Sequence, residues 1–191
     1  MKAAVLHAPN QPMTIEDIVL EKPKRREVLV RTAAAGLCHS DLHFIDGLYP
    51  YPLPAVLGHE AAGVVEAVGE DVTYLKPGDH VISCLSMFCG HCSFCLSGHL
   101  SLCGDPEVKP PAGKARRLGW KGQHMNQFLN LSAFAEQMVV HENALVKVRE
   151  DMLNGHDICH GGLISTLADS TFAFACNSYN ELTVAAGFDV N

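Results

Sequence analysis

Four closely spaced cysteines most strongly restrict what this chain can fold into. They occupy the stretch Cys89-Gly-His-Cys-Ser-Phe-Cys-Leu-Ser-Gly-His-Leu-Ser-Leu-Cys103, with intervals of two, two and seven residues. The Gly and Ser residues between them permit a loop in which four thiolates converge tetrahedrally on Zn²⁺ at ~2.3 Å, as in closed structural sites. An iron–sulfur ferredoxin would follow its fourth cysteine with proline, whereas Gly104 stands here. The spacing predicts a structural zinc on Cys89, Cys92, Cys95 and Cys103, with disulfides or unrelated buried thiols as the alternatives.

Length and composition indicate a soluble protein with one main core. A chain of 191 residues has room for one domain and a fragment, at ~100–200 residues per domain. Hydrophobic residues make up 48%, yet no apolar run approaches the ~18 residues that span a bilayer. The N-terminus lacks the apolar segment of a secretory signal, so we expect the cytoplasm. In that compartment eight cysteines indicate metal ligands or buried thiols before disulfides.

The charge balance argues against a polyanionic partner. Asp and Glu outnumber Lys and Arg by 21 to 14, giving a net charge of −7, and no basic stripe is present. We therefore expect no nucleic-acid partner. Because no apolar run is long enough to span a bilayer, we expect no membrane partner either. The sequence leaves open whether the chain forms a homo-oligomer.

The first half of the chain has the short apolar runs and turns of a β-rich fold. Residues 27–35 alternate with a period of two, which predicts a half-buried strand. Alternate prolines make residues 49–54 an extended loop. The other elements expected in this half are two strands within 2–20, a short helix within 38–47, and strands at 61–68 and 79–83.

The segment after the cysteines is expected to be irregular before it returns to strands. Residues 105–127 contain several prolines, and so long a connection in a compact domain is usually functional or mobile. Residues 133–140 and 144–148 again have strand-like composition. Many short strands with Gly and Pro turns predict a barrel-like all-β unit that closes near Val148.

The chain changes character past Arg149. Residues 161–177 place apolar side chains on one broad helical face, and residues 182–190 read as one strand. A helix and one strand cannot enclose a core. This tail must therefore pack on the barrel, bind a partner or remain loose.

A second group of metal-ligand residue types precedes the four cysteines. Cys38 and His59 are ligands of the kind that a catalytic Zn²⁺ uses, with a third protein ligand and an open position still to be found. Asp41 and Glu60 suit supporting roles, one orienting the His59 ring and the other lying near the metal. Gly63 stands where a His-Glu-x-x-His motif needs its second histidine, which argues against a zinc protease.

These motifs together resemble a known family. Gly-Leu-Cys-His-Ser-Asp at 36–41, Gly-His-Glu at 58–60, Pro-Gly-Asp at 77–79 and the four cysteines follow one another. From Met1 to about Met152 the chain resembles the GroES-like catalytic domain of the zinc-containing medium-chain alcohol dehydrogenases. The resemblance implies a mainly β, partly open barrel with a structural-zinc lobe at 89–103.

The resemblance also implies a catalytic metal and its chemistry. Cys38 and His59 would hold a catalytic zinc, with Glu60 close to it. The zinc would act as a Lewis acid in the oxidation of a small alcohol to an aldehyde. Phe44, Tyr49 and neighbouring aromatic residues could line an apolar pocket, but the substrate itself stays unassigned.

Three further residues receive roles from the same resemblance. Ser40 would accept the alcohol proton and pass it through the cofactor ribose to His43. His39 would lie near the pyrophosphate of the cofactor. The hydride would go to the nicotinamide of NAD(P).

The chain departs from the family beyond its barrel. No Gly-x-Gly-x-x-Gly follows an expected strand, so no NAD(P) site is present. The third zinc ligand is also missing, although Cys159 lies close to where it would come. We expect residues 1–150 to be a catalytic domain truncated before its nucleotide-binding domain, with weak or no activity alone.

The tail, residues 151–191, resembles a different family. Asn-Gly-His at 154–156, His-Gly-Gly at 160–162 and Leu-Ala-Asp at 167–169 are similar to the central-helix region of a hotdog-fold acyl-CoA thioesterase of the phenylacetate-pathway type. Asp169 would match the catalytic carboxylate. Two alternatives to the dehydrogenase therefore stand: thioester hydrolysis by this hotdog fragment, and a non-enzymatic, zinc-stabilised binding module.

Overall fold

The computed structural model describes residues 1–114 and 117–152 and divides the chain into two units, Met1–Lys147 and Val148–Asn191. The fold described below is that of the first unit. The described part of the second unit ends in the short 3-10 turn η4 (Glu150–Met152). The helix expected at 161–177 and the strand expected at 182–190 lie outside the described residues.

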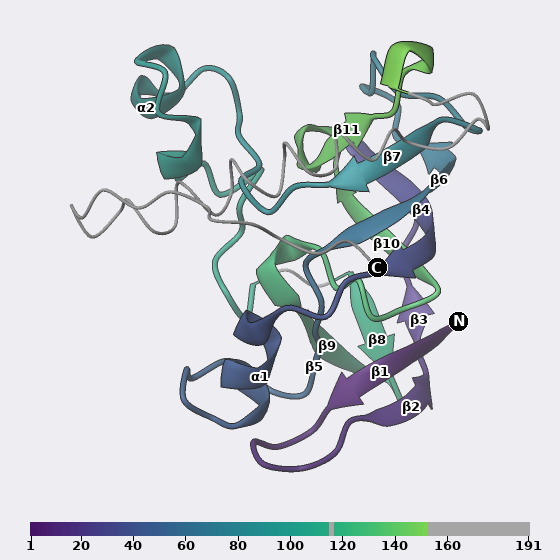
Figure 1. The fold of residues 1–191 in the computed structure, drawn as a ribbon, viewed down its shortest axis with the longest axis vertical. Coiled ribbons are helices and arrows are strands. Elements are labelled where there is room, and N and C mark those ends of the chain that lie inside the picture. Colours follow the sequence, from purple (N-terminus) through teal and green to yellow (C-terminus); the bar gives the residue numbers. More distant parts are fainter. Residues whose placement is uncertain (115–116, 153–191) are drawn as a thin grey trace, which may run out of the picture. The chain divides into compact units, whose positions relative to one another are not determined.

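Two curled sheets form the first unit, which confirms the mainly β fold expected from the sequence (Figure 1). One sheet has the order β2-β1-β5-β9-β8-β3, and the other has the order β10-β4-β6-β7-β11. The strands of the first sheet are β1 (Lys2–Leu6), β2 (Thr14–Asp17), β3 (Val19–Leu20), β5 (Ala55–Val56), β8 (Leu118–Trp120) and β9 (Gln123–Gln127). Those of the second are β4 (Glu27–Ala35), β6 (Ala61–Val68), β7 (His80–Ser83), β10 (Gln137–His141) and β11 (Leu145–Lys147).

Short helices occupy the connections between the strands. Helix α1 (His39–Ile45) follows β4, and helix α2 (Ser93–Leu96) lies within the cysteine stretch. The 3-10 turns are η1 (Leu100–Leu102), η2 (Phe128–Asn130) and η3 (Glu142–Ala144). None of the helices in the part of the chain that the structure describes is long and apolar enough to cross a lipid bilayer.

Strand β4 is an interior strand of the second sheet. It pairs antiparallel with β10 on one side and with β6 on the other. Val28 and Val30 are fully buried while Arg31 is exposed, which confirms the half-buried strand expected at 27–35. The register with β6 ends at Ala35 opposite Ala61, so the segments that follow β4 and precede β6 lie together.

The expectation of an irregular connection over residues 105–127 is wrong in its second half. Strands β8 and β9 form a hairpin in which Trp120 faces Gln123. The two-residue loop between them has positive φ at both positions, 48° at Lys121 and 77° at Gly122, as a type I′ turn requires. Lys-Gly is a weaker hairpin signal than Asn-Gly, so the turn went unrecognised.

Two strand boundaries also differ from expectation. Residues 2–20 hold three strands, β1, β2 and β3, where two were expected. The strand expected from residue 133 starts at Gln137. Residues 133–136 instead join the two sheets, because Ala135 forms a bridge with Ala3 and Phe134 accepts a hydrogen bond from the Ala4 N–H.

Candidate metal centres

The four cysteine sulfurs converge as the sequence predicts. The Sγ–Sγ distances are 3.8 Å between Cys89 and Cys95, 3.5 Å between Cys92 and Cys95, and 4.0 Å between Cys92 and Cys103. A Zn²⁺ with four sulfurs at ~2.3 Å requires sulfur-to-sulfur edges of about 3.8 Å. All four ligand atoms lie within 4.8 Å of one another. The donor set therefore fits a tetrahedral zinc.

Backbone N–H groups surround these sulfurs and favour their ionised form. Cys89 Sγ accepts from the N–H groups of His91 at 3.4 Å and Cys92 at 3.3 Å, and Cys103 Sγ accepts from Cys89 N–H at 3.3 Å. Burial, aided by the three neighbouring thiols, raises the pKa of the Cys95 thiol to about 11. Four thiolates this close need a cation, because burial and mutual repulsion both oppose their ionisation.

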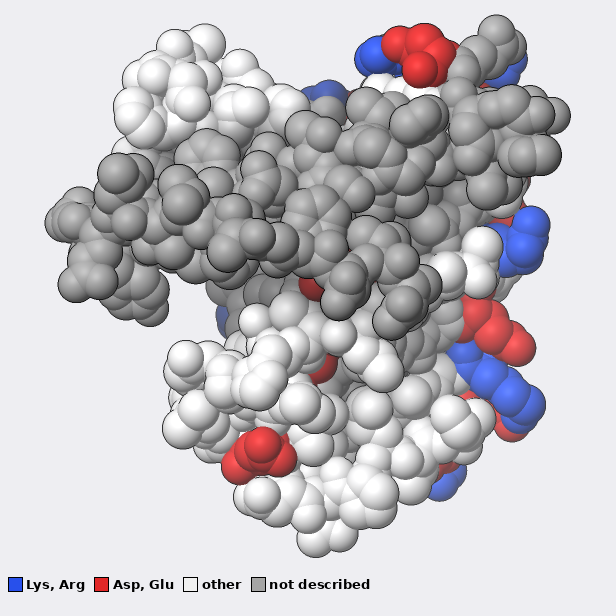
Figure 2. All heavy atoms as spheres, viewed as in Figure 1, with Lys and Arg blue, Asp and Glu red and all other residues white. Residues whose placement is uncertain are grey.

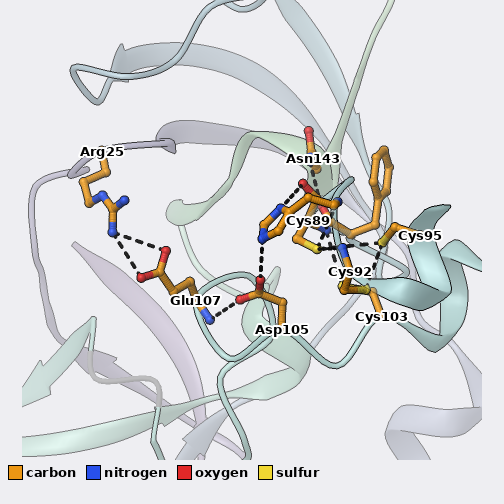
Figure 3. A network of polar contacts seen from close by, with 10 residues as sticks. Arg25, Cys89, Cys92, Cys95, Cys103, Asp105, Glu107 and Asn143 are labelled. Atoms are coloured by element: carbon orange, nitrogen blue, oxygen red, sulfur yellow. Dashed lines mark hydrogen bonds and ion pairs between the residues drawn. The ribbon is translucent and has the colours of Figure 1, made fainter.

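A chain of polar contacts connects this lobe to the barrel (Figure 3). The His91 ring lies 3.3 Å from an Asp105 carboxylate oxygen, and the other oxygen accepts from the Glu107 N–H at 2.9 Å. Glu107 in turn pairs with Arg25 at 3.3 Å. On the other side, the Asn143 amide donates to the Phe88 carbonyl at 2.6 Å. Cys89, His91 and Asp105 could also converge on a metal, but that set shares Cys89 with the four-cysteine site.

A second set of ligand atoms comes together from two separate segments. Cys38 follows β4 and precedes α1, whereas His59 and Glu60 directly precede β6. Their ligand atoms all lie within 4.8 Å of one another, and His59 Nε2 is 3.9 Å from a Glu60 carboxylate oxygen. The sheet register holds the two segments together, because the Gly36 N–H donates to the Glu60 carbonyl at 2.9 Å. Sulfur, imidazole and carboxylate are suitable ligands for a catalytic zinc.

The buried side chain of Asp41 fixes this second set from behind. It is 2% exposed. One oxygen contacts His59 Nδ1 at 3.2 Å and accepts from Gly58 N–H at 3.3 Å, while the other accepts from Cys38 N–H at 3.2 Å. The contact at Nδ1 leaves Nε2 of His59 as the ring nitrogen that faces Glu60. Asp41 is thus the carboxylate that orients the ring, and Glu60 is the one beside the ligand atoms.

Two glycines allow the backbone to approach closely at this second set. A Cβ at Gly36 would lie 2.3 Å from the Glu60 carboxylate. Gly58 has φ +86°, and a Cβ there would lie 2.5 Å from the Phe134 ring. Both glycines stand inside the motifs that suggested the site, so the sequence shows their spacing. The sequence does not show which side chains pack against them.

The three residues assigned to proton transfer and cofactor contact lie on α1. His39 and Ser40 are exposed and His43 is half-buried, with the His39 and His43 rings 4.9 Å apart. No hydrogen bond joins Ser40 to His43 within the described residues, so their relay stays a prediction. Cys159 and Asp169 fall outside the described residues, and their roles stay predictions as well.

Sequence reasoning missed one aromatic residue at the second set. Phe128 is fully buried in the turn after β9, with its ring 6.0 Å from the His59 ring. It also contacts Phe44 at 4.7 Å and Tyr51 at 5.1 Å between ring centroids. Phe128 stands far from the recognised motifs, one residue beyond the segment 105–127 that was expected to be irregular. Only the three-dimensional fold brings it to the site.

Comparison with known proteins identifies the family. The family model for the alcohol dehydrogenase GroES-like domain matches residues 24–150. An alcohol dehydrogenase class-3 from Pisum sativum is 41% identical over 156 residues, covering 78% of this chain and 41% of the relative. An S-(hydroxymethyl)glutathione dehydrogenase from Haemophilus influenzae is 42% identical over 165 residues, covering 83% of this chain and 43% of the relative.

Solved structures agree with this assignment. An alcohol dehydrogenase zinc-binding domain protein from Burkholderia ambifaria matches with a TM-score of 0.70 and 41% identity, covering 79% of this chain and 42% of that one. The benzyl alcohol dehydrogenase from Acinetobacter calcoaceticus matches with a TM-score of 0.68 and 37% identity, covering 78% and 41%. The chain spans about two fifths of the length of these relatives. The match over residues 24–150, together with two metal-ligand sets on a curled β fold, places the chain in the family of alcohol dehydrogenase GroES-like domains.

Proposed function

We propose that this chain carries the zinc-dependent catalytic domain of an alcohol dehydrogenase, which interconverts small alcohols and aldehydes. The observation that carries the proposal is the buried Asp41 carboxylate. Its contacts at 3.2–3.3 Å hold Cys38, Gly58 and His59 in one arrangement. A buried carboxylate that orients a histidine in this way is typical of metal sites in proteins.

In this proposal Cys38 and His59 hold the catalytic zinc and Glu60 lies beside it. The ion, when bound, supplies Lewis-acid stabilisation of negative charge on the alcohol oxygen. In this proposal Nδ1–H of His59 would donate to Asp41, which would leave Nε2 to hold the ion. The third protein ligand is unassigned, and Cys159 stays a candidate.

We further propose that α1 handles the proton and the cofactor. Ser40 would take the proton of the alcohol and pass it through the cofactor ribose to His43, with His39 near the cofactor pyrophosphate. The positions on one short helix support this order, because Ser40 and His43 are three residues apart and lie on neighbouring turns. Loss of turnover in Ser40→Ala with zinc retained would support the assignment.

The residues given carry no motif of the kind that binds a dinucleotide. No Gly-x-Gly pattern occurs anywhere in the 191 residues. We therefore expect hydride transfer to NAD(P) by this chain alone to be weak. We also propose that residues 1–150 form the catalytic domain and residues 151–191 a separate fragment. Limited proteolysis should cut near residue 150, and a chain that stays uncut there would argue against the boundary.

Cobalt substitution tests the proposed catalytic site. Co²⁺ bound through a thiolate absorbs near-ultraviolet and visible light, so the Cys38 site should add its own bands to those of the four-cysteine site. Cys38→Ser should remove those bands and abolish residual alcohol oxidation. Cys84→Ser is the matched control, because Cys84 is a half-buried cysteine outside both metal-ligand sets. Unchanged spectra and turnover in Cys38→Ser would contradict the proposal.

A further inference from the structure

Three of the four sulfurs in the cysteine lobe are shielded from solvent. The exposed fractions are 5% for Cys89, 8% for Cys95 and 4% for Cys103, and Cys92 is half-buried. A hydrated ion must give up its water before it reaches such sulfurs, which is costly unless protein ligands replace the water molecules in turn. Zinc therefore needs ligands at the surface of the lobe in order to enter and leave.

A second ligand set lies at that surface and shares one sulfur with the first. Ligand atoms of Cys89, His91 and Asp105 all lie within 4.8 Å of one another. The His91 side chain is 75% exposed, whereas that of Asp105 is 17% exposed. We call these three residues the outer set. Asp105 lies beside Cys89 in Figure 3, so the set extends from solvent at His91 to a buried sulfur.

The geometry of the outer set suits ligands around one ion. His91 Nε2 lies 3.3 Å from Asp105 Oδ2. Nitrogen and oxygen ligands at ~2.0–2.2 Å from one tetrahedral Zn²⁺ lie about 3.4 Å apart. The other carboxylate oxygen accepts from the Glu107 N–H at 2.9 Å, so Oδ2 is the atom presented to an ion. Cys89 Sγ accepts from the N–H groups of His91 and Cys92, which favours the thiolate that a metal requires.

The lobe itself has no formal charge that competes with the outer set for an ion. No Asp, Glu, Lys or Arg stands between Asp79 and Asp105 in the sequence. On the face drawn in Figure 2, the atoms over α2 are all white, neither acidic nor basic. Lys109 reaches the lobe from outside, where the Ser101 carbonyl accepts from its Nζ at 3.1 Å. Asp105 is therefore the carboxylate nearest to the four cysteines along the chain, and its charge attracts cations.

We propose that the outer set is the path by which zinc enters and leaves the four-cysteine site. His91 and Asp105 bind the arriving ion at the surface, and Cys89 keeps its contact while the other three cysteines replace them. Departure follows the same steps in reverse. Such a path lowers the barrier between the loaded chain and the free ion without changing the energy of either. It therefore speeds loading and release by the same factor and leaves the affinity unchanged.

Metal exchange on the cobalt-loaded chain tests the proposal. Every protein carries Cys38→Ser, so that the visible bands of thiolate-bound Co²⁺ come from the lobe. The decay of these bands on addition of excess Zn²⁺ gives the exchange rate, and chelator competition gives the zinc affinity. We expect His91→Ala and Asp105→Asn each to slow exchange about tenfold, as when one ligand contact is lost from the barrier, and to keep the affinity within about twofold.

Two control variants match these substitutions. His99→Ala removes the other histidine of the lobe, which lies in no ligand set of the described residues and contacts Ser97 Oγ at 3.1 Å. Glu107→Gln removes an exposed carboxylate charge two residues from Asp105. Both controls should exchange metal at the wild-type rate.

The combination of rate and affinity separates a path from a merely supporting contact. Unchanged exchange in either outer-set variant would overturn the proposal. Faster exchange with weaker affinity would overturn it too, because that is what loss of a contact that only supports the lobe produces. Equal slowing in either control would also overturn it. If one outer-set variant failed to take up cobalt, the other would decide, and none of these outcomes depends on dehydrogenase activity.

Discussion

The two metal-ligand sets are built in opposite ways. The four cysteines of the lobe come from one stretch of fifteen residues, and local N–H groups supply their hydrogen bonds. The Cys38 and His59 set is assembled from segments 21 residues apart, which the β4–β6 register and the buried Asp41 bring together. A local site depends on its own spacing, whereas an assembled site depends on the whole sheet. Loss of a cysteine should therefore disrupt the lobe site, whereas a change in sheet packing should disrupt the Cys38 and His59 site.

Removal of the lobe zinc is expected to have the largest effect. The double substitution Cys92→Ser with Cys95→Ser takes away two of four sulfurs that lie 3.5–4.0 Å from their neighbours. Structural zinc contributes ~10–16 kcal/mol to the folding of zinc-finger peptides, so a loss of about 4 kcal/mol is a modest expectation here. Thermal unfolding followed by circular dichroism should show Tm falling by about 8 °C or more. Cys84→Ser should leave Tm within about 2 °C of the wild type.

Substitution of Asp41 should weaken zinc binding at the Cys38 and His59 set and leave zinc binding at the four-cysteine lobe unchanged. Asp41→Asn keeps the shape of the side chain but loses the charge that holds the His59 ring. Loss of a carboxylate that orients a metal-binding histidine typically lowers the metal affinity about 10–100-fold. Chelator competition should show that loss at the second site and no change at the lobe. Asp46→Asn, at the exposed end of α1, is the control. Equal zinc affinity in Asp41→Asn and the wild type would show that Asp41 does not orient His59 for metal binding.

Gly58→Ala should show how strongly the assembled site depends on packing. The new Cβ would have φ +86° and would lie 2.5 Å from the Phe134 ring. We expect about 2–3 kcal/mol of destabilisation from clash and backbone strain together. Gly78→Ala is the control, with φ +93° and open space around the Cβ, and should cost about 1 kcal/mol. Urea unfolding measures both, and equal losses would mean that the Phe134 contact is unimportant.

The smallest effect is expected at a carboxylate that belongs to neither set. Burial alone would raise the pKa of Asp79, but the hydrogen bonds from Lys147 and the Lys76 N–H lower it below the ordinary value. Lys147 Nζ lies 2.7 Å from the carboxylate. Because the pKa of Asp79 is lower in the folded state, its carboxylate stabilises the fold at pH values above the unfolded pKa of ~3.9. This stabilisation is lost as the pH falls through the folded pKa.

Asp79→Asn should therefore cost about 1 kcal/mol near pH 7. The cost should shrink as pH falls from about 5 towards 3, because wild-type Asp79 then becomes protonated. Urea unfolding at several pH values measures the difference. Asp17→Asn, which breaks an exposed pair with Lys2, should have little effect at any of them. A cost that does not change with pH would show that the charge of Asp79 is not what stabilises the fold.

The same contrast explains how much the sequence could predict. The lobe was predictable because its ligand spacing lies within fifteen residues. The strand at 27–35 was predictable from its period of two. The β8–β9 hairpin was missed, because the Lys121-Gly122 turn carries a weak signal and β8 has only three residues.

The assembled set was only partly predictable. Cys38, Asp41, His59 and Glu60 stood out as residue types in two short motifs, but spacing could not assign which carboxylate faces which side of the ring. The Phe128 and Phe134 contacts depend on segments more than 60 residues away in the chain from His59. Tertiary packing, rather than local pattern, sets those contacts.

Zinc stoichiometry by native mass spectrometry tests the central claim most directly. The claim is that two independent metal sites exist, one local and one assembled. The account predicts two zinc ions on the wild type, one on Cys38→Ser and one on the Cys92→Ser, Cys95→Ser double variant, each lost without the other. Identical zinc content in all three proteins would contradict it, and so would the loss of both ions from Cys38→Ser alone.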